Sequence, residues 1–337
     1  MIIYLALEDL DQRYTNMMNT VVSRYVDVVL RGTQYGKIAS GQFLDTFGTS
    51  RWKSEILTQV AEMFMQGKIK DGDKFFVSDL FWPGLESIKY MAELADIDVK
   101  IYGYSHAGIT DPVDFVNKLG DWVVPLEYSW YQMCEKVFVG SEFHKRLILE
   151  KFSALNEDGY LEKIIVTGAP WDLNYVDEVY PTMRVEKSIR AKQVVMASRL
   201  SWEKGYGEFL DFAIKHPDIR FFITSGKRGM FVPKNVKYAF DLSKRDYYKL
   251  LSQSEWFVSF SYQETFGYSL QEAIAYGCKI AVPNRACYPE MVPHHNLYNN
   301  IKQLEAMLQS DADYTVPFEM TNQWNDNVID IMRAIKK

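Results

Sequence analysis

Short runs of β-branched and aromatic residues alternate with longer amphipathic stretches from one end of this sequence to the other. Such alternation is typical of βαβ units, in which helices cover the faces of a parallel sheet. The runs fall into two series, so we expect two Rossmann-like α/β domains. The predicted strands are residues 2–7, 26–30, 74–77, 99–104, 136–139 and 164–167, then 193–197, 220–224, 236–239, 256–260 and 279–282; helical patterns include 83–95, 208–215, 246–253 and 270–276.

The length of 337 residues also favours two domains, since one domain holds on the order of 150 residues. The stretch 171–190 has no clean periodicity and is the expected join. We therefore predict domains at 1–175 and 176–321, followed by a terminal helix at 322–337. Open α/β sheets bind ligands beyond the carboxyl ends of their strands, so a cleft between the two domains is the expected site.

Composition excludes several classes of protein. With 47% apolar and 24% charged residues the chain has a globular composition, and its net charge of −6 argues against nonspecific coating of nucleic acid, though not against a local basic groove. Three cysteines without metal-ligand spacing favour a reducing compartment. The sequence has no basic leader and no run of about 18 apolar residues, so we expect a cytoplasmic protein without a membrane span.

The segment 256–284 carries the most chemical information. A buried-type strand leads into a polar loop, a helix and a second strand. Gly267 allows the backbone to approach a ligand closely, and the helix start after it offers N–H groups suited to a diphosphate. The order Ser269-Leu-Gln-Glu272 is that of a capping box, in which a glutamate bonds the first amide of its own helix. A capped helix of an ordinary α/β domain would have the same pattern.

The spacing within this segment is more specific. Glu264 and Glu272 are separated by seven residues that include Phe266-Gly267, and Ala-Ile-Ala-Tyr-Gly follows Glu272. This segment resembles the donor-binding signature of retaining GT-B glycosyltransferases, the group 1 family that includes sucrose synthases. The resemblance implies that Glu264 faces the hydroxyls of the transferred sugar and that Gly267, Tyr268 and Ser269 meet the diphosphate. It implies a ribose contact for Glu272, which competes with the capping role.

A second resemblance lies upstream, in Val194-Val-Met-Ala-Ser-Arg-Leu-Ser-Trp-Glu-Lys-Gly. It is similar to the family segment in which a strand ends in Gly-Arg-Leu and a Lys-Gly pair follows, with Ser198 in place of that glycine. Arg199 and Lys204 fall on the matching positions, where two cations would stabilise a diphosphate leaving group. The alternative is a pair of solvated surface cations. The resemblance implies that backbone groups near Ala239–Leu242 face the nucleotide base, so the identity of the base stays open, with a UDP-sugar favoured.

The first domain has fewer signals. Family members often carry a Gly-rich loop after the first strand, whereas this chain has Glu8-Asp-Leu-Asp-Gln-Arg-Tyr. The segment Tyr102-Gly-Tyr-Ser-His-Ala-Gly places His106 directly after a predicted strand, where it resembles the family site at which a histidine approaches the donor sugar. A structural or solvated histidine is the alternative reading.

The resemblance implies the GT-B fold and transfer of a hexosyl or pentosyl group from a nucleotide diphosphate sugar to an acceptor hydroxyl, with retention. It implies neither a metal nor a cofactor. The acceptor we favour is a hydroxymethylated pyrimidine in phage DNA, which would place the enzyme in the host cytoplasm. Arg51-Trp52-Lys53 is the candidate basic and aromatic wall for such a base. A saccharide, lipid or small-molecule acceptor remains open, as does a non-catalytic nucleotide-sugar-binding subunit.

Overall fold

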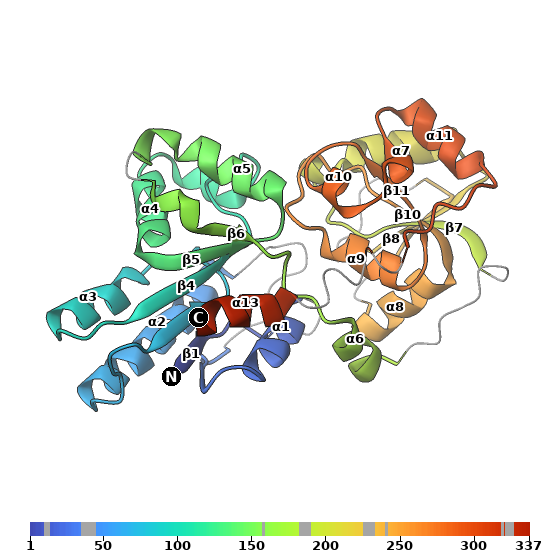
Figure 1. Ribbon diagram of the computed structural model, residues 1–337. Coiled ribbons are helices and arrows are strands. Elements are labelled where there is room, and N and C mark those ends of the chain that lie inside the picture. The colour runs from blue at the N-terminus through green and yellow to red at the C-terminus, as the bar shows by residue number, and fades with distance from the viewer. Residues whose placement is uncertain are drawn as a thin grey trace. The chain divides into compact units, whose positions relative to one another are not determined.

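The computed structural model describes residues 1–9, 14–34, 45–156, 159–181, 190–224, 233–239, 242–317, 320 and 327–337. These residues form two α/β units (Figure 1). Unit 1 contains the described residues up to Trp171 together with the C-terminal helix, and unit 2 contains those from Asp172 to Met320.

Unit 1 is built on a six-stranded sheet in the order β2-β1-β3-β4-β5-β6, with every neighbouring pair parallel. Its strands are β1 (Ile2–Leu5), β2 (Val28–Leu30), β3 (Lys74–Val77), β4 (Lys100–Ser105), β5 (Cys134–Val139) and β6 (Ile164–Val166). Its helices are α1 (Tyr14–Ser23), α2 (Thr46–Met65), α3 (Glu86–Leu94), α4 (Val123–Met133), α5 (Glu142–Lys151) and α13 (Asn327–Lys336), with short 3-10 turns at Phe115–Leu119, Ser153–Leu155 and Tyr160–Lys163.

Unit 2 repeats this plan with the strand order β12-β11-β10-β7-β8-β9, again all parallel. Its strands are β7 (Ala191–Met196), β8 (Arg220–Ile223), β9 (Val236–Tyr238), β10 (Ser254–Val258), β11 (Lys279–Pro283) and β12 (Leu297–Tyr298). Its helices are α6 (Leu173–Val179), α7 (Tyr206–Lys215), α8 (Lys244–Gln253), α9 (Tyr268–Ala275), α10 (Tyr288–Met291) and α11 (Ile301–Gln309), with 3-10 turns η5 (Trp202–Lys204) and η6 (His294–Asn296).

The apolar runs become strands because a parallel sheet is covered on both faces and its central strands need continuous apolar sequence. Strand β3 is buried at Phe75, Phe76 and Val77. In unit 2 the strand residue Phe221 meets the α7 residue Phe209 edge to face, with ring centroids 5.5 Å apart. Many of the aromatic residues therefore fill the two cores.

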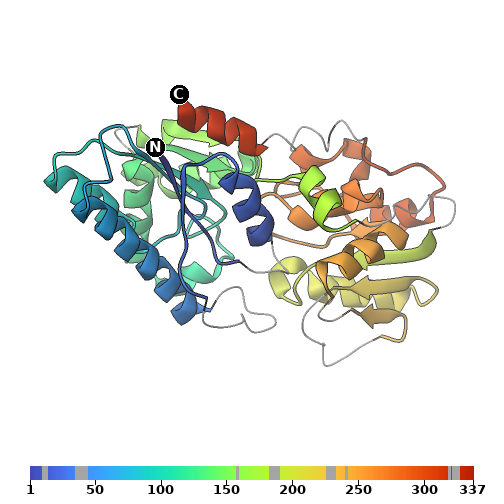
Figure 2. The ribbon, with the colours of Figure 1, turned by 90° about the horizontal axis from the view of Figure 1, so that it is seen from below.

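The C-terminal helix α13 belongs to unit 1 and is bonded at both ends. The Asn327 side-chain amide donates to the Ala169 carbonyl at 2.6 Å, and Lys74 Nζ and Lys136 Nζ donate to the carbonyls of Ile335 and Ala334. The two lysine cations also interact favourably with the negative C-terminal end of the helix dipole. Within unit 1, α13 and α1 lie on one face of the sheet and α2 and α3 on the other (Figures 1 and 2).

The predicted α/β class with two parallel sheets is confirmed. Strand β12 was not predicted, since two residues are too few to leave a pattern. The predicted terminal helix spans 322–337, of which 322–326 lie outside the described residues.

Candidate active site

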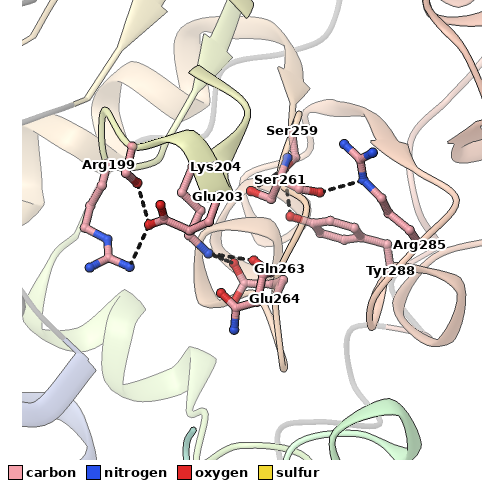
Figure 3. Close-up of polar contacts among 10 residues, drawn as sticks. Arg199, Glu203, Lys204, Ser259, Ser261, Gln263, Glu264, Arg285 and Tyr288 are labelled. Atoms are coloured by element: carbon pink, nitrogen blue, oxygen red, sulfur yellow. Dashed lines mark hydrogen bonds and ion pairs between the residues drawn. The ribbon is translucent and has the colours of Figure 1, made fainter. Parts of the chain in front are cut away.

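The loop between β10 and α9 begins with a buried cluster of hydroxyl groups. Ser259 Oγ lies 2.7 Å from the Tyr288 hydroxyl and 3.1 Å from Ser261 Oγ (Figure 3). Burial raises the pKa of Tyr288, so its phenol stays protonated. The cluster ties the start of this loop, which carries Glu264, to helix α10.

The structure brings Lys204 and Glu264 together. Lys204 Nζ donates to the Gln263 carbonyl at 2.8 Å and lies 3.1 Å from Glu264 Oε2 (Figure 3). The lysine follows β7 and the glutamate follows β10, and these two strands are neighbours in the sheet. Their side chains are 12% and 23% exposed. The pair is thus half-buried at the carboxyl ends of adjacent strands, where α/β sheets bind ligands.

At Gly205 the turn after β7 packs closely against the loop after β10. Its φ is +67°, and a Cβ there would lie 2.3 Å from the Phe260 carbonyl oxygen. The Tyr262 amide also donates to the Glu203 carbonyl at 2.8 Å. Because only glycine tolerates both the conformation and the close approach, the position of Lys204 depends on it.

Arg199 lies on the same turn as Lys204 and is more exposed, at 45%. Its Nη2 donates to Glu203 Oε1 at 3.3 Å (Figure 3). The Ser201 hydroxyl donates to the same oxygen at 2.5 Å. Glu203 was not predicted as a site residue, although it lies between the two predicted cations in the sequence. The turn therefore presents one exposed and one half-buried cation, each with a carboxylate partner.

Arg285, two residues after the end of β11, was not predicted as a site residue either. Its Nε and Nη2 donate to the carbonyls of Ser261 and Phe260 at 2.9 and 2.8 Å, and its guanidinium lies 3.9 Å from the Tyr262 ring centroid. It braces the loop that leads to Glu264. The next residue, Ala286, has a φ of +53°, which is uncommon for a residue with a side chain.

The predicted capping box at the start of α9 is wrong. The helix begins at Tyr268, and its N-cap is Gly267 with a φ of +81° and no side-chain cap. The Gly267 carbonyl accepts from the amides of Leu270 and Gln271 at 2.9 and 3.1 Å. The glycine turns the chain into the helix two residues earlier than predicted, which leaves Ser269 inside the first turn.

The Glu272 carboxylate faces α8 instead of its own helix start. Its Oε1 accepts from Lys244 Nζ at 2.6 Å and from the Tyr248 hydroxyl at 3.0 Å. The capping role is thereby excluded, and the ribose role remains a prediction. Leu242 is half-buried just before α8, and residues 240 and 241 of the same loop lie outside the described residues.

His106 directly follows β4 in unit 1, at the carboxyl edge of that sheet. Its Nε2 lies 2.9 Å from the Ser78 carbonyl oxygen, so this nitrogen carries the proton. The ring packs against Tyr14 and Tyr104, with centroids 4.9 and 4.6 Å away. Burial lowers the pKa of His106. The imidazole is a neutral group with a fixed tautomer, and its predicted sugar contact stays a prediction.

The triplet Arg51-Trp52-Lys53 does not form the predicted basic and aromatic wall. Trp52 is buried and its indole N–H donates to the Ala6 carbonyl at 2.9 Å. Lys53 is also buried, and its Nζ donates to the Phe81 carbonyl at 2.6 Å. The triplet lies within α2, whose periodicity turns Trp52 and Lys53 toward the core and leaves only Arg51 at the surface.

The segment that replaces a Gly-rich loop is described only at its two ends, since residues 10–13 lie outside the described residues. Glu8 accepts from the Thr49 hydroxyl at 2.7 Å, and Asp9 accepts from the Asn19 amide at 2.6 Å. In the described ranges no group of three or more His, Cys, Asp or Glu side chains could hold a metal ion. No helix in those ranges is both long enough and apolar enough to cross a bilayer.

Part of the chain is similar in sequence to known proteins. Residues 182–306 match the family described as Glycosyl transferases group 1. A 67-residue stretch is 36% identical to tRNA-queuosine alpha-mannosyltransferase of Drosophila melanogaster. That stretch is 20% of this chain and 18% of the fly protein, so the two share only a small part of their lengths.

Two solved structures resemble nearly the whole chain. Sucrose-phosphate synthase from Thermosynechococcus elongatus superposes with a TM-score of 0.63 at 12% identity, covering 99% of this chain and 96% of the synthase. The catalytic domain of starch synthase IV from Arabidopsis thaliana, bound to ADP and acarbose, gives 0.64 at 11% identity, with coverage of 100% and 99%. At these identities the likeness shows the fold alone. The chain has the GT-B fold, and its residues 182–306 match the family described as Glycosyl transferases group 1.

Proposed function

We propose that this protein transfers a sugar from a nucleoside diphosphate sugar to an acceptor hydroxyl, with retention at the anomeric carbon. The observation that carries the proposal is the Lys204–Glu264 pair at 3.1 Å, with Arg199 on the same turn, inside the matched domain. Cations and a carboxylate at the carboxyl ends of adjacent strands suit a ligand with a diphosphate and a polyhydroxylated sugar.

Lys204 is suited to the leaving group. An ammonium has three N–H donors, and two of them go to the Gln263 carbonyl and Glu264. We assign the third to a diphosphate oxygen, with Arg199 as the second cation. As the bond between the anomeric carbon and the phosphate oxygen breaks, negative charge develops on the diphosphate, and both cations stabilise it.

We propose that the acceptor oxygen attacks the anomeric carbon on the same face from which the diphosphate departs, and this gives retention. The acceptor oxygen bonds to the anomeric carbon, and the acceptor proton passes to the departing diphosphate oxygen, so atoms and charges balance without an enzyme nucleophile. Glu264 orients the sugar hydroxyls, with its carboxylate held by Lys204. The neutral His106 is the proposed sugar contact from unit 1, while Gly267, Tyr268 and Ser269 are the proposed diphosphate contacts and Leu242 lies in the loop proposed to face the base.

For the acceptor we propose a hydroxyl on a modified nucleoside in nucleic acid, with hydroxymethylated pyrimidines in DNA as the first candidates. The support is the 67-residue similarity to an enzyme named for a tRNA nucleoside. The burial of Trp52 and Lys53 removes the one residue-level argument for a DNA wall in unit 1.

The test has two arms. Incubation with UDP-, GDP- and ADP-sugars, followed by NMR of the product anomeric proton, measures transfer and stereochemistry; an inverted product contradicts retention. The second arm offers hydroxymethylated DNA, unmodified DNA, tRNA and oligosaccharides with the donor that reacts. We expect a mass increase of one sugar on the hydroxymethylated DNA and none on unmodified DNA. Transfer to oligosaccharide alone overturns the nucleic-acid acceptor, and donor binding without any turnover indicates a non-catalytic subunit.

A further inference from the structure

Two residues of α8 hold a single oxygen of Glu272. Lys244 Nζ and the Tyr248 hydroxyl both end on Oε1, at 2.6 and 3.0 Å. The two donors stand four residues apart and so lie on one face of the helix. The Glu272 side chain is only 7% exposed. With so little of the carboxylate open, its orientation decides whether a ligand can bind to it.

The Lys244 side chain is held in place from several sides. Its ammonium lies 5.2 and 5.3 Å from the ring centroids of Tyr247 and Tyr248, and the side chain is 15% exposed. The Ser243 hydroxyl caps α8 by accepting from the Asp246 amide at 3.1 Å. The cation–π contacts favour this position of the ammonium, and the capped helix start fixes the backbone that carries it.

Tyr248 is fixed in the same way. Its ring stacks on Tyr276 with centroids 5.0 Å apart and meets Tyr180 edge to face at 5.6 Å. Burial, and then the Glu272 charge, raise the pKa of Tyr248, so its hydroxyl keeps the proton that it donates. The carboxylate thus has two preorganised donors on one oxygen.

We propose that Lys244 and Tyr248 are positioning residues that turn Oε2 of Glu272 toward the ribose hydroxyls of the donor and so select ribonucleotides over 2′-deoxyribonucleotides. This inference rests on the proposed function, which supplies the nucleotide. A hydroxyl that donates to a carboxylate changes affinity by about tenfold or more, so loss of that geometry is measurable. The competing account is that the pair only ties α8 to α9.

The test compares the full chain with Lys244→Met, Lys244→Arg, Tyr248→Phe and Lys279→Met by isothermal titration. The probes are the nucleoside diphosphate that binds best among UDP, GDP and ADP, and its 2′-deoxy analogue. Lys279 is the matched control, because its Nζ pairs with Glu255 at 3.0 Å and lies 5.4 Å from the Trp256 ring centroid. It stands at the amino end of β11, away from the carboxyl edge.

We expect the wild type and Lys279→Met to prefer the ribonucleotide by the same factor. Lys244→Met should weaken ribonucleotide binding about tenfold and leave 2′-deoxynucleotide binding unchanged, with partial rescue in Lys244→Arg and a smaller loss in Tyr248→Phe. An unchanged preference in Lys244→Met, or an equal loss for both probes, overturns the inference and leaves the proposed function standing. Failure of all three nucleotides to bind the wild type overturns the proposed function itself.

Discussion

Lys204 Nζ lies 3.1 Å from Glu264 Oε2 and also donates to the Gln263 carbonyl at 2.8 Å, which joins the turn after β7 to the loop after β10. Each residue thereby fixes the other. Their contact fixes both the carboxylate that we propose orients the sugar and the half-buried cation that we propose stabilises the diphosphate.

Replacement of Lys204 by Met should lower kcat about a hundredfold or more, because it removes a preorganised charge from the leaving group. The Michaelis constant for the donor should change less. Lys163→Met is the control: Lys163 Nζ donates to the Gln132 and Cys134 carbonyls in unit 1, so its loss should lower stability and leave kcat unchanged. Steady-state kinetics with the reacting donor provide the measurement, and an unchanged kcat in Lys204→Met contradicts the leaving-group role.

Gly205→Ala should destabilise unit 2 by about 3 kcal/mol, because the new Cβ meets the Phe260 carbonyl in a left-handed backbone. Two controls separate the causes. Gly207→Ala, in α7 with no heavy atom within 4 Å, should stabilise by about 0.5 kcal/mol, while Gly72→Ala, with a φ of +79° and open space, isolates the strain at about 1 kcal/mol. Urea unfolding measures all three, and equal losses in Gly205→Ala and Gly72→Ala would show that the close approach to Phe260 has no effect.

Glu127 makes the stability of unit 1 depend on pH. Burial raises the pKa of its carboxyl to about 8, against an ordinary value of 4.5. Between these two values the folded protein binds more protons than the unfolded chain, so the free energy of unfolding falls as the pH rises from 4.5 to 8. Glu127→Gln removes this pH dependence. The difference in the free energy of unfolding between the two proteins should therefore change by about 1.4 kcal/mol per pH unit in the middle of the window. Urea unfolding at pH 5 and pH 8 checks this; parallel pH profiles for both proteins would be the contrary result.

His106 should remain neutral throughout the neutral pH range, with its proton on Nε2. Burial lowers its pKa below the ordinary 6.5, and the Ser78 carbonyl at 2.9 Å can only accept. Stability should therefore be lost as the pH falls through and below 6.5, where the unfolded histidine gains a proton first. Nitrogen-15 NMR of the imidazole reports both tautomer and titration, and a midpoint above 6.5 would contradict this assignment.

Much of the fold could be predicted because parallel sheets need apolar runs that the sequence displays directly. The encounter of Lys204 with Glu264 was also implicit, since both follow strands of one sheet and carboxyl ends of parallel strands share an edge. Local pattern and global topology agree at these residues.

Other features depend on tertiary contacts that no local pattern contains. Ser269 and Glu272 have the spacing of a capping box, but a left-handed Gly267 and the ion pair with Lys244 outcompete it. The burial of Trp52 could have been predicted from the sequence, because Trp52, Ile56 and Val60 recur every four residues along α2 and are all buried. The helical period, and not the basic-aromatic triplet, decides where these side chains lie.

The proposed function requires unit 2 to bind a nucleoside diphosphate sugar through Arg199, Lys204 and Glu264. Isothermal titration of UDP-, GDP- and ADP-sugars into the wild type and into Arg199→Ala and Lys204→Ala measures this binding. We predict saturable binding of one donor to the wild type, weakened about tenfold or more in each variant, as loss of a charged partner of a phosphate implies. Absence of binding by every donor, or undiminished binding in both variants, would contradict the account.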